Sequence, residues 1–326
     1  MPNPAQKQLE YMDSLSLQGK KFFFAIDFLA ENIEILTEKE LLQSEIHINF
    51  PEFKTQVNTS LKNSEADKLK INPTSKEKYQ QGFAETQESI QAGKLSLINY
   101  SCKTGIESKL TLGEIYNIAS AKYKILFKDQ WICFSPETFI KIINNKIYTF
   151  PMKGTIDASI PNAKEILLSD NKEDAEQHAV VNLLKDDLQK ISNNVQLTNF
   201  KQIDFIKTNH KNLYTTSSEI SGTIKPEYEG KIGSLMQQLL PAGSILGAPR
   251  EEALRLILQT EGYARGFYSG IAGWFDGKNL DSCVLIRFIE KENGKLYFKS
   301  GGGITKMSQM EKEYQEVINK IYVPVC

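Results

Sequence analysis

Lys153 stands between a predicted strand over residues 145–150 and a Gly-Thr turn, Gly154-Thr155. A lysine amine is a nucleophile only without its proton, and its pKa in water is about 10.4. Burial or a nearby cation can lower that pKa enough for the amine to attack a substrate, and the glycine would let a ligand approach the backbone. A lysine at a strand end is more often a solvated residue that protects the sheet edge, so the choice depends on the rest of the chain.

Two pairs of glutamates lie three residues apart on predicted helices, Glu173 with Glu176 and Glu313 with Glu316. Residues at this spacing share a helix face. Four carboxylates from two helices could hold Mg²⁺, a hard cation that binds oxygen and keeps some waters for a substrate to displace. Most such pairs are solvated, and Glu316 could instead pair with Lys320.

Two segments rich in small residues could contact an anionic ligand. The loop Pro241–Arg250, which contains Ser244, leads into a predicted helix whose free N–H groups attract anions. It could equally be a tight structural connection. Gly301, Gly302 and Gly303 could bring backbone close to a ligand or form a hairpin bend or bulge.

Arg287 lies within a predicted apolar strand, residues 283–290. A buried charge needs a partner. A bound carboxylate would suit the bidentate geometry of arginine, and a structural Asp or Glu is the alternative.

The composition is that of an ordinary globular protein. Its 326 residues are 40% hydrophobic and 24% charged, and 39 Lys and Arg against 40 Asp and Glu give a formal charge of -1. The chain has no excess of basic residues that would indicate nucleic acid or a membrane surface as a partner. The start of the chain is polar, and the apolar stretch 22–30 is short and contains Asp27, so neither a signal peptide nor a membrane span is expected.

The cysteines and histidines show no metal-ligand spacing, so a zinc site is not expected. Widely separated cysteines predict a reduced, cytoplasmic protein. These residues are Cys102, Cys133, Cys283, Cys326, His47, His178 and His210.

The order of predicted elements indicates an α+β fold, with two mostly antiparallel sheets packed with helices in a layered sandwich. Helices are predicted over 74–93, starting with a capping box of Thr74 and Glu77, over 172–191, from Pro249 as the first helical residue, and over 307–321. A break at Asn72-Pro73 separates a divergent N-terminal part, 1–71, from the region 72–326, within one compact unit. The predicted strands are 21–28, 95–101, 123–127, 131–135, 139–143, 146–150, 204–208, 213–224, 268–275, 283–290 and 296–299.

In this order, these segments resemble the family of chorismate-utilising enzymes over roughly residues 72 to 322. Several ordered motifs together are specific, whereas each alone is not. The lysine of the Pro-x-Lys-Gly-Thr motif resembles the aminodeoxychorismate synthase branch, component I, because anthranilate and isochorismate synthases usually carry alanine there. The motifs are Ser135-Pro-Glu137, Pro151-Met-Lys-Gly-Thr155, Glu176 with Leu183-Leu-Lys-Asp-Asp187, Gly243-Ser-Ile-Leu-Gly-Ala-Pro249, Arg265-Gly-Phe-Tyr-Ser-Gly270, residues 281–287, Gly301-Gly-Gly-Ile304 and Glu313-Tyr-Gln-Glu316.

The resemblance implies conversion of chorismate and ammonia to 4-amino-4-deoxychorismate, for 4-aminobenzoate and folate synthesis. Lys153 would attack ring C2 while the C4 hydroxyl leaves. Glu137 would protonate that hydroxyl and then act as the base when ammonia adds at C4 and expels the lysine, a double role that suits a carboxyl with a raised pKa.

The resemblance also implies the binding groups. Mg²⁺ would be held by the four glutamates and would coordinate the ring carboxylate. The predicted substrate-binding residues are Gly154 and Thr155 for the ring carboxylate, Tyr268 and Arg287 with backbone of Gly301, Gly302 and Gly303 for the enolpyruvyl carboxylate, and Ser244.

Ammonia would come from a separate glutamine amidotransferase subunit. The chain shows no cysteine in a nucleophile elbow and no Cys-His-Glu pattern of a glutaminase. The resemblance therefore predicts a protein partner.

The sequence departs from the family pattern at several positions. Thr215 replaces a His linked to proton shuttling in pyruvate elimination, which disfavours anthranilate formation. Leu246 and Arg250 replace the usual Thr and Lys, and the loss of the Thr hydroxyl puts one ligand hydrogen bond in doubt. Asn182 and Lys185-Asp186 alter the usual Val-Asp-Leu-x-Arg-Asn-Asp run. No Leu-Leu-Glu-Ser motif of a tryptophan site is present, so feedback inhibition by tryptophan is not expected.

Two alternatives stay open. One is another chorismate reaction, such as anthranilate, isochorismate or salicylate synthesis, against which Lys153 argues. The other is a non-catalytic subunit that binds the glutaminase, against which the presence of Lys153, Glu137 and the acidic pairs argues.

Overall fold

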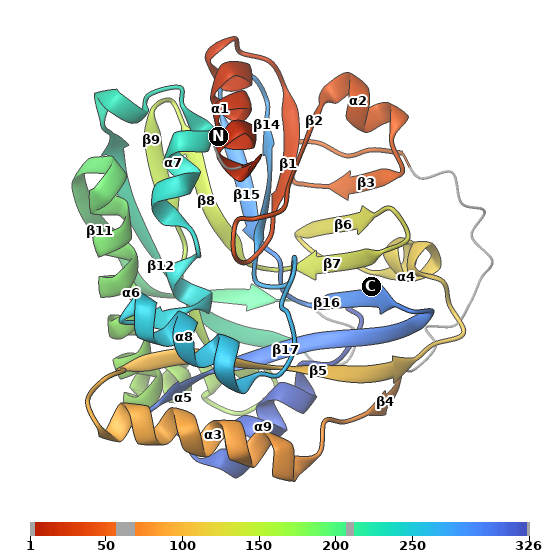
Figure 1. Ribbon diagram of the computed structural model, residues 1–326. Helices are drawn as coiled ribbons and strands as arrows, with labels where there is room; N and C mark the ends of the chain where they lie inside the picture. Colours follow the sequence, from red (N-terminus) through yellow and green to blue (C-terminus); the bar gives the residue numbers. More distant parts are fainter. Residues whose placement is uncertain (1–3, 57–68, 207–211, 325–326) are drawn as a thin grey trace.

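The computed structural model describes residues 4–56, 69–206 and 212–324, apart from the side chains of residues 171, 172, 175, 176 and 206. Two antiparallel sheets pack against each other, and helices cover their outer faces (Figure 1). This arrangement confirms the predicted α+β sandwich.

The first sheet has nine strands in the described part of the chain, in the order β10-β12-β9-β8-β15-β14-β1-β2, and β11 also pairs with β12. Its strands are β1 Phe22–Ile26, β2 Ile33–Thr37, β8 Thr138–Ile143, β9 Lys146–Thr149, β10 Met152–Asp157, β11 Ser192–Ile206, β12 Leu213–Ile224, β14 Ile271–Phe275 and β15 Leu280–Val284.

The second sheet has eight strands among the described residues, in the order β13-β5-β17-β16-β7-β6-β3, and β4 pairs with β5. Its strands are β3 Ile46–Asn49, β4 Lys70–Asn72, β5 Leu97–Glu107, β6 Tyr123–Phe127, β7 Trp131–Ser135, β13 Gly247–Ala248, β16 Phe288–Glu292 and β17 Lys295–Thr305. In Figure 1, β5 and β17 run side by side across the lower part of the molecule.

The helices lie outside the two sheets (Figure 1). They are α1 Pro4–Leu17, α2 Glu38–Gln43, α3 Lys76–Gln91, α4 Leu112–Ile118, α5 Ala163–Ser169, α6 Asn171–Ile191, α7 Ile232–Leu239, α8 Arg250–Thr260 and α9 Met310–Asn319, with 3₁₀ turns η1 Pro226–Tyr228 and η2 Gly243–Ile245.

Strand β1 shows why the first sheet is covered on both faces. Successive strand residues point to opposite sides, and all five residues of Phe22–Ile26 are buried. Phe22 and Phe24 pack with the helices α1, α6 and α7, whereas Phe23 packs with β6 and β7 of the second sheet. Each fully buried aromatic side chain stabilises the fold by about 1.5–3 kcal/mol.

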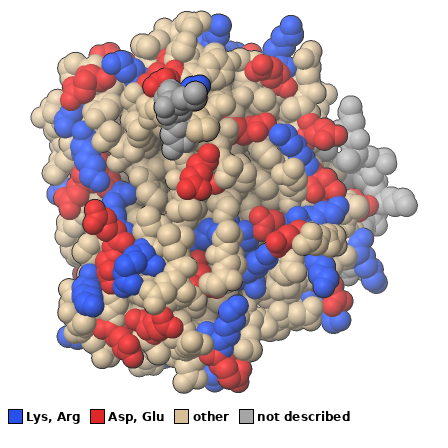
Figure 2. Space-filling model, viewed as in Figure 1, with Lys and Arg blue, Asp and Glu red and all other residues tan. Residues whose placement is uncertain are grey.

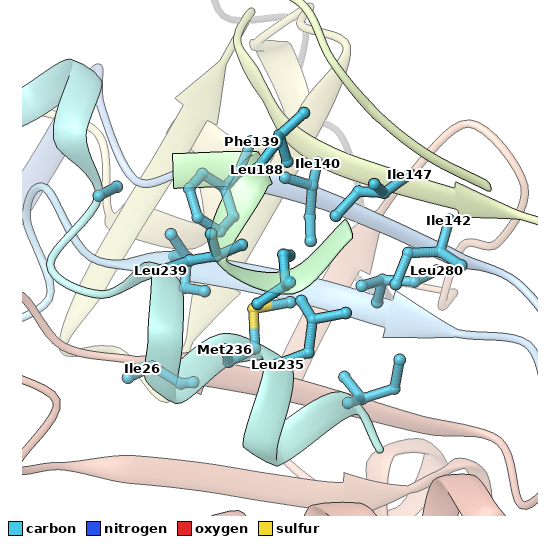
Figure 3. Packing of buried hydrophobic residues seen from close by; sticks show 14 of the residues in the cluster. Ile26, Phe139, Ile140, Ile142, Ile147, Leu188, Leu235, Met236, Leu239 and Leu280 are labelled. Carbon is cyan, nitrogen blue, oxygen red and sulfur yellow. The ribbon is translucent and has the colours of Figure 1, made fainter. Parts of the chain in front are cut away.

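Helices α6 and α7 cover the outer face of the first sheet. Figure 3 shows Leu188 of α6 and Met236 of α7 packed against side chains of β1, β8, β9 and β15. The apolar positions of α6 recur at helical spacing, which buries one stripe of the helix. The buried α6 side chains of this stripe include Val180, Leu184, Leu188 and Ile191.

The predicted strands 123–127, 131–135 and 213–224 are confirmed to the residue. Two predicted helix starts are wrong by one residue. The first cap is Ser75, whose hydroxyl accepts from the Lys78 N–H, while Thr74 donates to the Lys103 carbonyl (3.2 Å). Pro249 is the N-cap of α8 and not its first helical residue. Both errors are within the normal uncertainty of helix ends.

The residues before position 72 contribute strands to both sheets, β1 and β2 to the first and β3 and β4 to the second. The division at residue 71 stays a prediction. Residues 207 and 208 of a predicted strand, together with His210 and Cys326, lie outside the described residues.

The molecular surface carries both signs of charge, interspersed over the face seen in Figure 2. Within the described ranges, no helix combines the length and the apolar character needed to cross a membrane. Three cysteines, Cys102, Cys133 and Cys283, are buried free thiols. A cytoplasmic location stays a prediction.

Candidate active site

Lys153 lies inside β10 and not at a turn, which corrects the prediction for the Gly-Thr pair. β10 pairs with β12 as Lys153 opposite Thr216 and Thr155 opposite Thr215, with a register shift between them. Gly154 is the extra residue of this bulge and has φ +67, a conformation that favours glycine. The bulge accommodates Gly154 as an extra residue, and β10 continues on both sides of it.

The absence of a side chain at Gly154 also lets a helix approach. A Cβ at this position would lie 3.0 Å from Leu167 Cδ1 of α5 and 3.1 Å from Glu173 Oε2 of α6. Glu173, predicted as a metal ligand, is thereby placed next to Lys153. The side chain of Glu176 lies outside the described part of the structure. Thr155 is exposed on β10.

The three glycines 301–303 form neither a bend nor a bulge. They lie within β17, where Gly302 pairs with Tyr100 of β5 in an unbroken register. A Cβ at Gly302 would lie 3.6 Å from Glu316 Oε1 and 3.9 Å from Glu313 Oε2, both of α9. At Gly303 it would lie 3.7 Å from Lys153 Nζ. The bare strand therefore brings Lys153 and two predicted metal ligands to neighbouring residues of β17.

Glu137 follows β7 and is half-buried beside this group. Its backbone N–H donates to Ser135 Oγ (3.1 Å), and the Ser244 hydroxyl donates to its carboxylate (3.5 Å). Burial raises the pKa of Glu137, while Lys153, the Ser244 hydrogen bond and Lys320 act in the opposite direction. Ser244, which was predicted to bind substrate, therefore contacts Glu137, the predicted proton donor.

The residues around Lys153, Glu137 and the glycines 301–303 form the candidate cluster. Lys320, at the C-terminal cap of α9, belongs to this cluster and was not predicted from the sequence. Its amine donates to the Gly301 carbonyl (2.9 Å) and pairs with Glu316 (2.7 Å). Burial lowers the pKa of Lys320; Glu316 opposes this shift, while Arg287 and Lys153 add to it. The i,i+4 spacing of Lys320 to Glu316 is visible in the sequence, but this spacing alone predicts only a solvent-exposed ion pair.

Arg287 does not lie inside a strand, because the predicted strand 283–290 is two strands. β15 ends at Val284 in the first sheet and β16 begins at Phe288 in the second. Arg287, with φ +53, lies where the chain crosses between the sheets. Its guanidinium donates to the Lys320 carbonyl (2.9 Å) and lies over the Tyr322 ring. A periodicity argument cannot detect this crossing, since the residues on both sides of Arg287, 283–286 and 288–289, are apolar.

Tyr268 is buried in the core between the sheets, with its ring 6.1 Å from that of Phe288. The strand predicted from residue 268 begins only at Ile271, as β14, because Ser269 adopts a left-handed conformation with φ +64. The structure therefore places the Tyr268 side chain in the core between the two sheets.

A buried ion pair joins the loop of Ser244 to the glycine strand. Arg265 binds both oxygens of Glu261 (2.8 and 2.6 Å), and both side chains are at most 1% exposed. Arg265 also donates to the carbonyls of Ile245 (3.0 Å) and Asn99 (2.6 Å). Ile245 follows Ser244, and Asn99 pairs with Gly303. The ion pair therefore fixes two walls of the cluster relative to each other.

Arg265→Met is expected to lower the free energy of unfolding by about 3–5 kcal/mol, because Glu261 would stay buried without its partner. Urea denaturation followed by circular dichroism measures the loss. The double variant Glu261→Gln/Arg265→Met should lose less than the single variant. Arg255→Met, which breaks the exposed pair with Glu252 on α8, is the matched control and should change little. Equal losses in both arginine variants would contradict the assignment.

The departures from the family pattern have structural partners. Arg250 pairs with the buried Asp187 and donates to the Pro241 carbonyl, which ties α8 to α6. Leu246 is buried in the apolar cluster under β5 and not directed at a ligand. Thr215 is buried and donates to the Gly154 carbonyl (2.7 Å).

The described acidic side chains offer oxygen donors beside Gly302 of β17 and beside Gly154 of β10. Glu313 is only 3% exposed, and a carboxylate is costly to bury without a cation or hydrogen-bond donors. No three acidic, His or Cys groups within the described residues lie close enough together to hold a metal ion, and this set does not include the Glu176 side chain. Glu313, Glu316 and Glu173 fit Mg²⁺ by donor chemistry.

A half-buried lysine, a carboxyl with a raised pKa and a group of acids beside bare backbone are typical of an enzyme that acts on a small anionic substrate. A sequence profile of the family described as chorismate binding enzyme matches residues 19–325. The chain therefore belongs to this family, as the motifs indicated.

Two relatives share most of their length with this chain. A Haemophilus influenzae protein described as an uncharacterized PabA-like protein is 40% identical over 320 residues, 98% of this chain and 97% of the relative. A Pasteurella multocida protein with a similar description is 45% identical over 253 residues, 78% of each chain.

More distant relatives differ in the reaction that their names state. Anthranilate synthase component 1 of Archaeoglobus fulgidus is 30% identical over 258 residues, 76% of this chain and 61% of the relative. Aminodeoxychorismate synthase component 1 of Escherichia coli is 27% identical over 262 residues, 76% and 56% of the two chains. The relatives establish the family and leave the individual reaction open.

The fold is shared with solved structures. A putative 2,3-dihydroxybenzoate-specific isochorismate synthase from Bacillus anthracis superimposes with a TM-score of 0.70 over 97% of this chain and 86% of that chain, at 21% identity. At this identity the likeness supports the fold alone.

Proposed function

We propose that this chain converts chorismate and ammonia to 4-amino-4-deoxychorismate through a covalent adduct with Lys153, for 4-aminobenzoate and folate synthesis. The observation that carries the proposal is the place of the lysine amine. It lies beside Gly303 and within electrostatic range of Glu137 and Lys320. A nucleophile and a proton donor thus share one small region, as covalent catalysis requires.

In the first step, Lys153 Nζ forms a bond to ring C2, the two conjugated double bonds of the ring shift by one position each, and the C4–O bond breaks. The leaving hydroxyl takes a proton from Glu137 and departs as water. In the second step, ammonia forms a bond to C4, the two double bonds shift back and the C2–N bond breaks, which restores the neutral lysine. The proton released from the new ammonium group returns to the Glu137 carboxylate. Atoms and protons therefore balance over the cycle.

Cationic and backbone groups around the cluster would hold the substrate. Lys320 donates to the Gly301 carbonyl and Arg287 donates to the Lys320 carbonyl, and a dianionic substrate would be attracted to these two cations. Bare backbone at Gly302 and Gly303 leaves room for it. Gly154, Thr155 and Ser244 keep their predicted binding roles, whereas Tyr268 packs in the core between the sheets and is not proposed as a ligand.

Mg²⁺ would be held by Glu313 and Glu316 of α9 with Glu173 and Glu176 of α6. When bound, the ion would neutralise the ring carboxylate and fix its position. Lys320 already pairs with Glu316, so it would keep part of the acidic charge balanced.

The test is incubation of the purified chain with chorismate, ammonium chloride and Mg²⁺, with mass identification of the product. We expect 4-amino-4-deoxychorismate, and loss of at least about 90% of its formation after EDTA treatment, reversed by Mg²⁺. Anthranilate with released pyruvate, isochorismate or salicylate would replace this proposal. Absence of any turnover, also with glutamine and a glutaminase present, would favour a non-catalytic subunit.

We also propose a protein partner, on the basis of the family resemblance. The chain would receive ammonia from a glutamine amidotransferase subunit, because no glutaminase motif was found in its sequence. Glutamine-dependent turnover that requires a second protein, while ammonium supports turnover without it, would be the supporting result.

A further inference from the structure

Two neighbouring threonines of β12 hold the backbone on both sides of the bulge in β10. The Thr216 hydroxyl donates to the Lys153 carbonyl (2.6 Å), and the Thr215 hydroxyl donates to the Gly154 carbonyl (2.7 Å). Both threonines are at most 2% exposed. Two consecutive carbonyls at the bulge are therefore bonded by side chains of the adjacent strand.

These bonds occur where the strand ladder is locally disrupted. A bulge leaves its extra residue without a regular ladder partner, and here that residue is Gly154, between the paired residues Lys153 and Thr155. Glycine has the greatest backbone freedom of any residue. Without the two hydroxyls, the peptide between Lys153 and Gly154 could rotate, and the direction of the Lys153 side chain would change with it.

A change of direction at this residue would act directly on the cluster. The amine lies 3.7 Å from the position that a Cβ would take at Gly303, and Glu173 Oε2 lies 3.1 Å from the position that a Cβ would take at Gly154 of the bulge. A displacement of about 1 Å at a reacting group can cost about a hundredfold in rate. The two hydrogen bonds from Thr215 and Thr216 to the carbonyls of Gly154 and Lys153 form a backbone clamp. This clamp is positioned to affect turnover without a contact to substrate.

We propose that Thr215 and Thr216 are positioning residues that fix the Lys153 amine by hydrogen-bonding the two carbonyls at the bulge. The effect on turnover rests on the proposed function, whereas the effect on the lysine itself does not. Valine has the shape of threonine without the hydroxyl, and serine keeps the hydroxyl.

The chain offers a matched control on the same sheet. Thr149 of β9 is buried, and its hydroxyl donates to the Phe139 carbonyl (2.8 Å) in the same way. Thr149→Val removes a comparable bond away from the bulge. Its expected loss of thermal stability is similar to that of Thr216→Val, and its kcat should stay within about twofold of the unmodified protein.

Thr215→Val and Thr216→Val are expected to lower kcat by about 10- to 100-fold, with KM changed by less than about threefold. Thr215→Ser and Thr216→Ser should restore most of kcat. Unchanged kcat in both valine variants, failure of both serine variants to restore it, or an equal loss in Thr149→Val would overturn the proposal.

A second readout is independent of turnover. The rate at which trinitrobenzenesulfonate modifies Lys153, relative to the exposed Lys146 in the same sample, is measured by peptide mass spectrometry. We expect this ratio to change in Thr215→Val and Thr216→Val and to stay constant in Thr149→Val. A constant ratio in all three variants would overturn the positioning role. Failure of chorismate to protect Lys153 in the unmodified protein would instead reject the proposed function.

Discussion

Replacing Lys153 with alanine is expected to lower the rate of 4-amino-4-deoxychorismate formation by about a thousandfold or more. The reason is chemical: without the amine no bond to ring C2 can form, and the remaining groups only bind substrate and donate a proton. The measurement is kcat/KM with chorismate and ammonium as substrates, with the product identified by chromatography and mass spectrometry. Product identity matters because a chain without the amine could still catalyse another chorismate reaction.

Three further variants separate nucleophilic attack from charge and packing. Lys153→Arg keeps the positive charge and Lys153→Met keeps the length of the side chain, and both should be as inactive as Lys153→Ala. Lys146→Ala removes an exposed lysine from β9 of the same sheet and should leave the rate unchanged. An intact mass with an added substrate-derived group on the unmodified chain, lost in Lys153→Met, would support the adduct directly. Normal turnover by Lys153→Met to the same product would remove the amine from the mechanism.

Replacing Glu137 with glutamine is expected to lower kcat by about 10²- to 10⁴-fold, which is the usual contribution of a positioned acid or base. The amide has nearly the same shape and can still accept from Ser244, so the fold and KM should change little. Only the transferable proton is lost. Steady-state kinetics at the pH of maximum activity measures this effect.

The pH dependence follows from the direction of the Glu137 pKa. Burial raises this pKa above its ordinary value, so the protonated acid persists to higher pH than for an exposed glutamate. Since the first step needs the protonated form, kcat should fall as the pH rises through this pKa. Glu137→Gln should lose that descending limb, with free ammonia held constant across the series.

Glu34→Gln is the matched control, because Glu34 is a half-buried carboxylate of β2 that pairs with Lys128 (2.9 Å) outside the cluster. Its pH profile should match that of the unmodified protein. If Glu137→Gln kept both the rate and the descending limb, another group would be the proton donor.

The sequence identified most of the candidate groups because they stand in short, local motifs. Lys153 in Pro151–Thr155 and Glu137 in Ser135-Pro-Glu137 need only a few adjacent residues to be recognised. The strands 123–127 and 213–224 could be predicted for a similar reason, since their apolar patterns and turn residues are properties of neighbouring positions.

Lys320 and Arg287 show what such local patterns miss. The pairing of Lys320 with Glu316 is visible at i,i+4, but its bond to the Gly301 carbonyl depends on how α9 packs against β17. The chain crossing at Arg287 is hidden because the end of β15 and the start of β16 are apolar and follow each other closely.

The hydrogen bonds of Thr215 and Thr216 at the bulge, and the bonds from Arg265 to the carbonyls of Ile245 and Asn99, were decided by tertiary structure alone. Thr216 faces Lys153 only because β12 pairs with β10 in one register, and a shift by one residue would turn its hydroxyl to the other face of the sheet. Arg265 meets Asn99 from a position 166 residues away in the chain. The amino-acid sequence specifies which reactive groups the protein has, and the pairing of distant strands specifies which of them meet, because only packing converts a long separation along the chain into a hydrogen-bond distance.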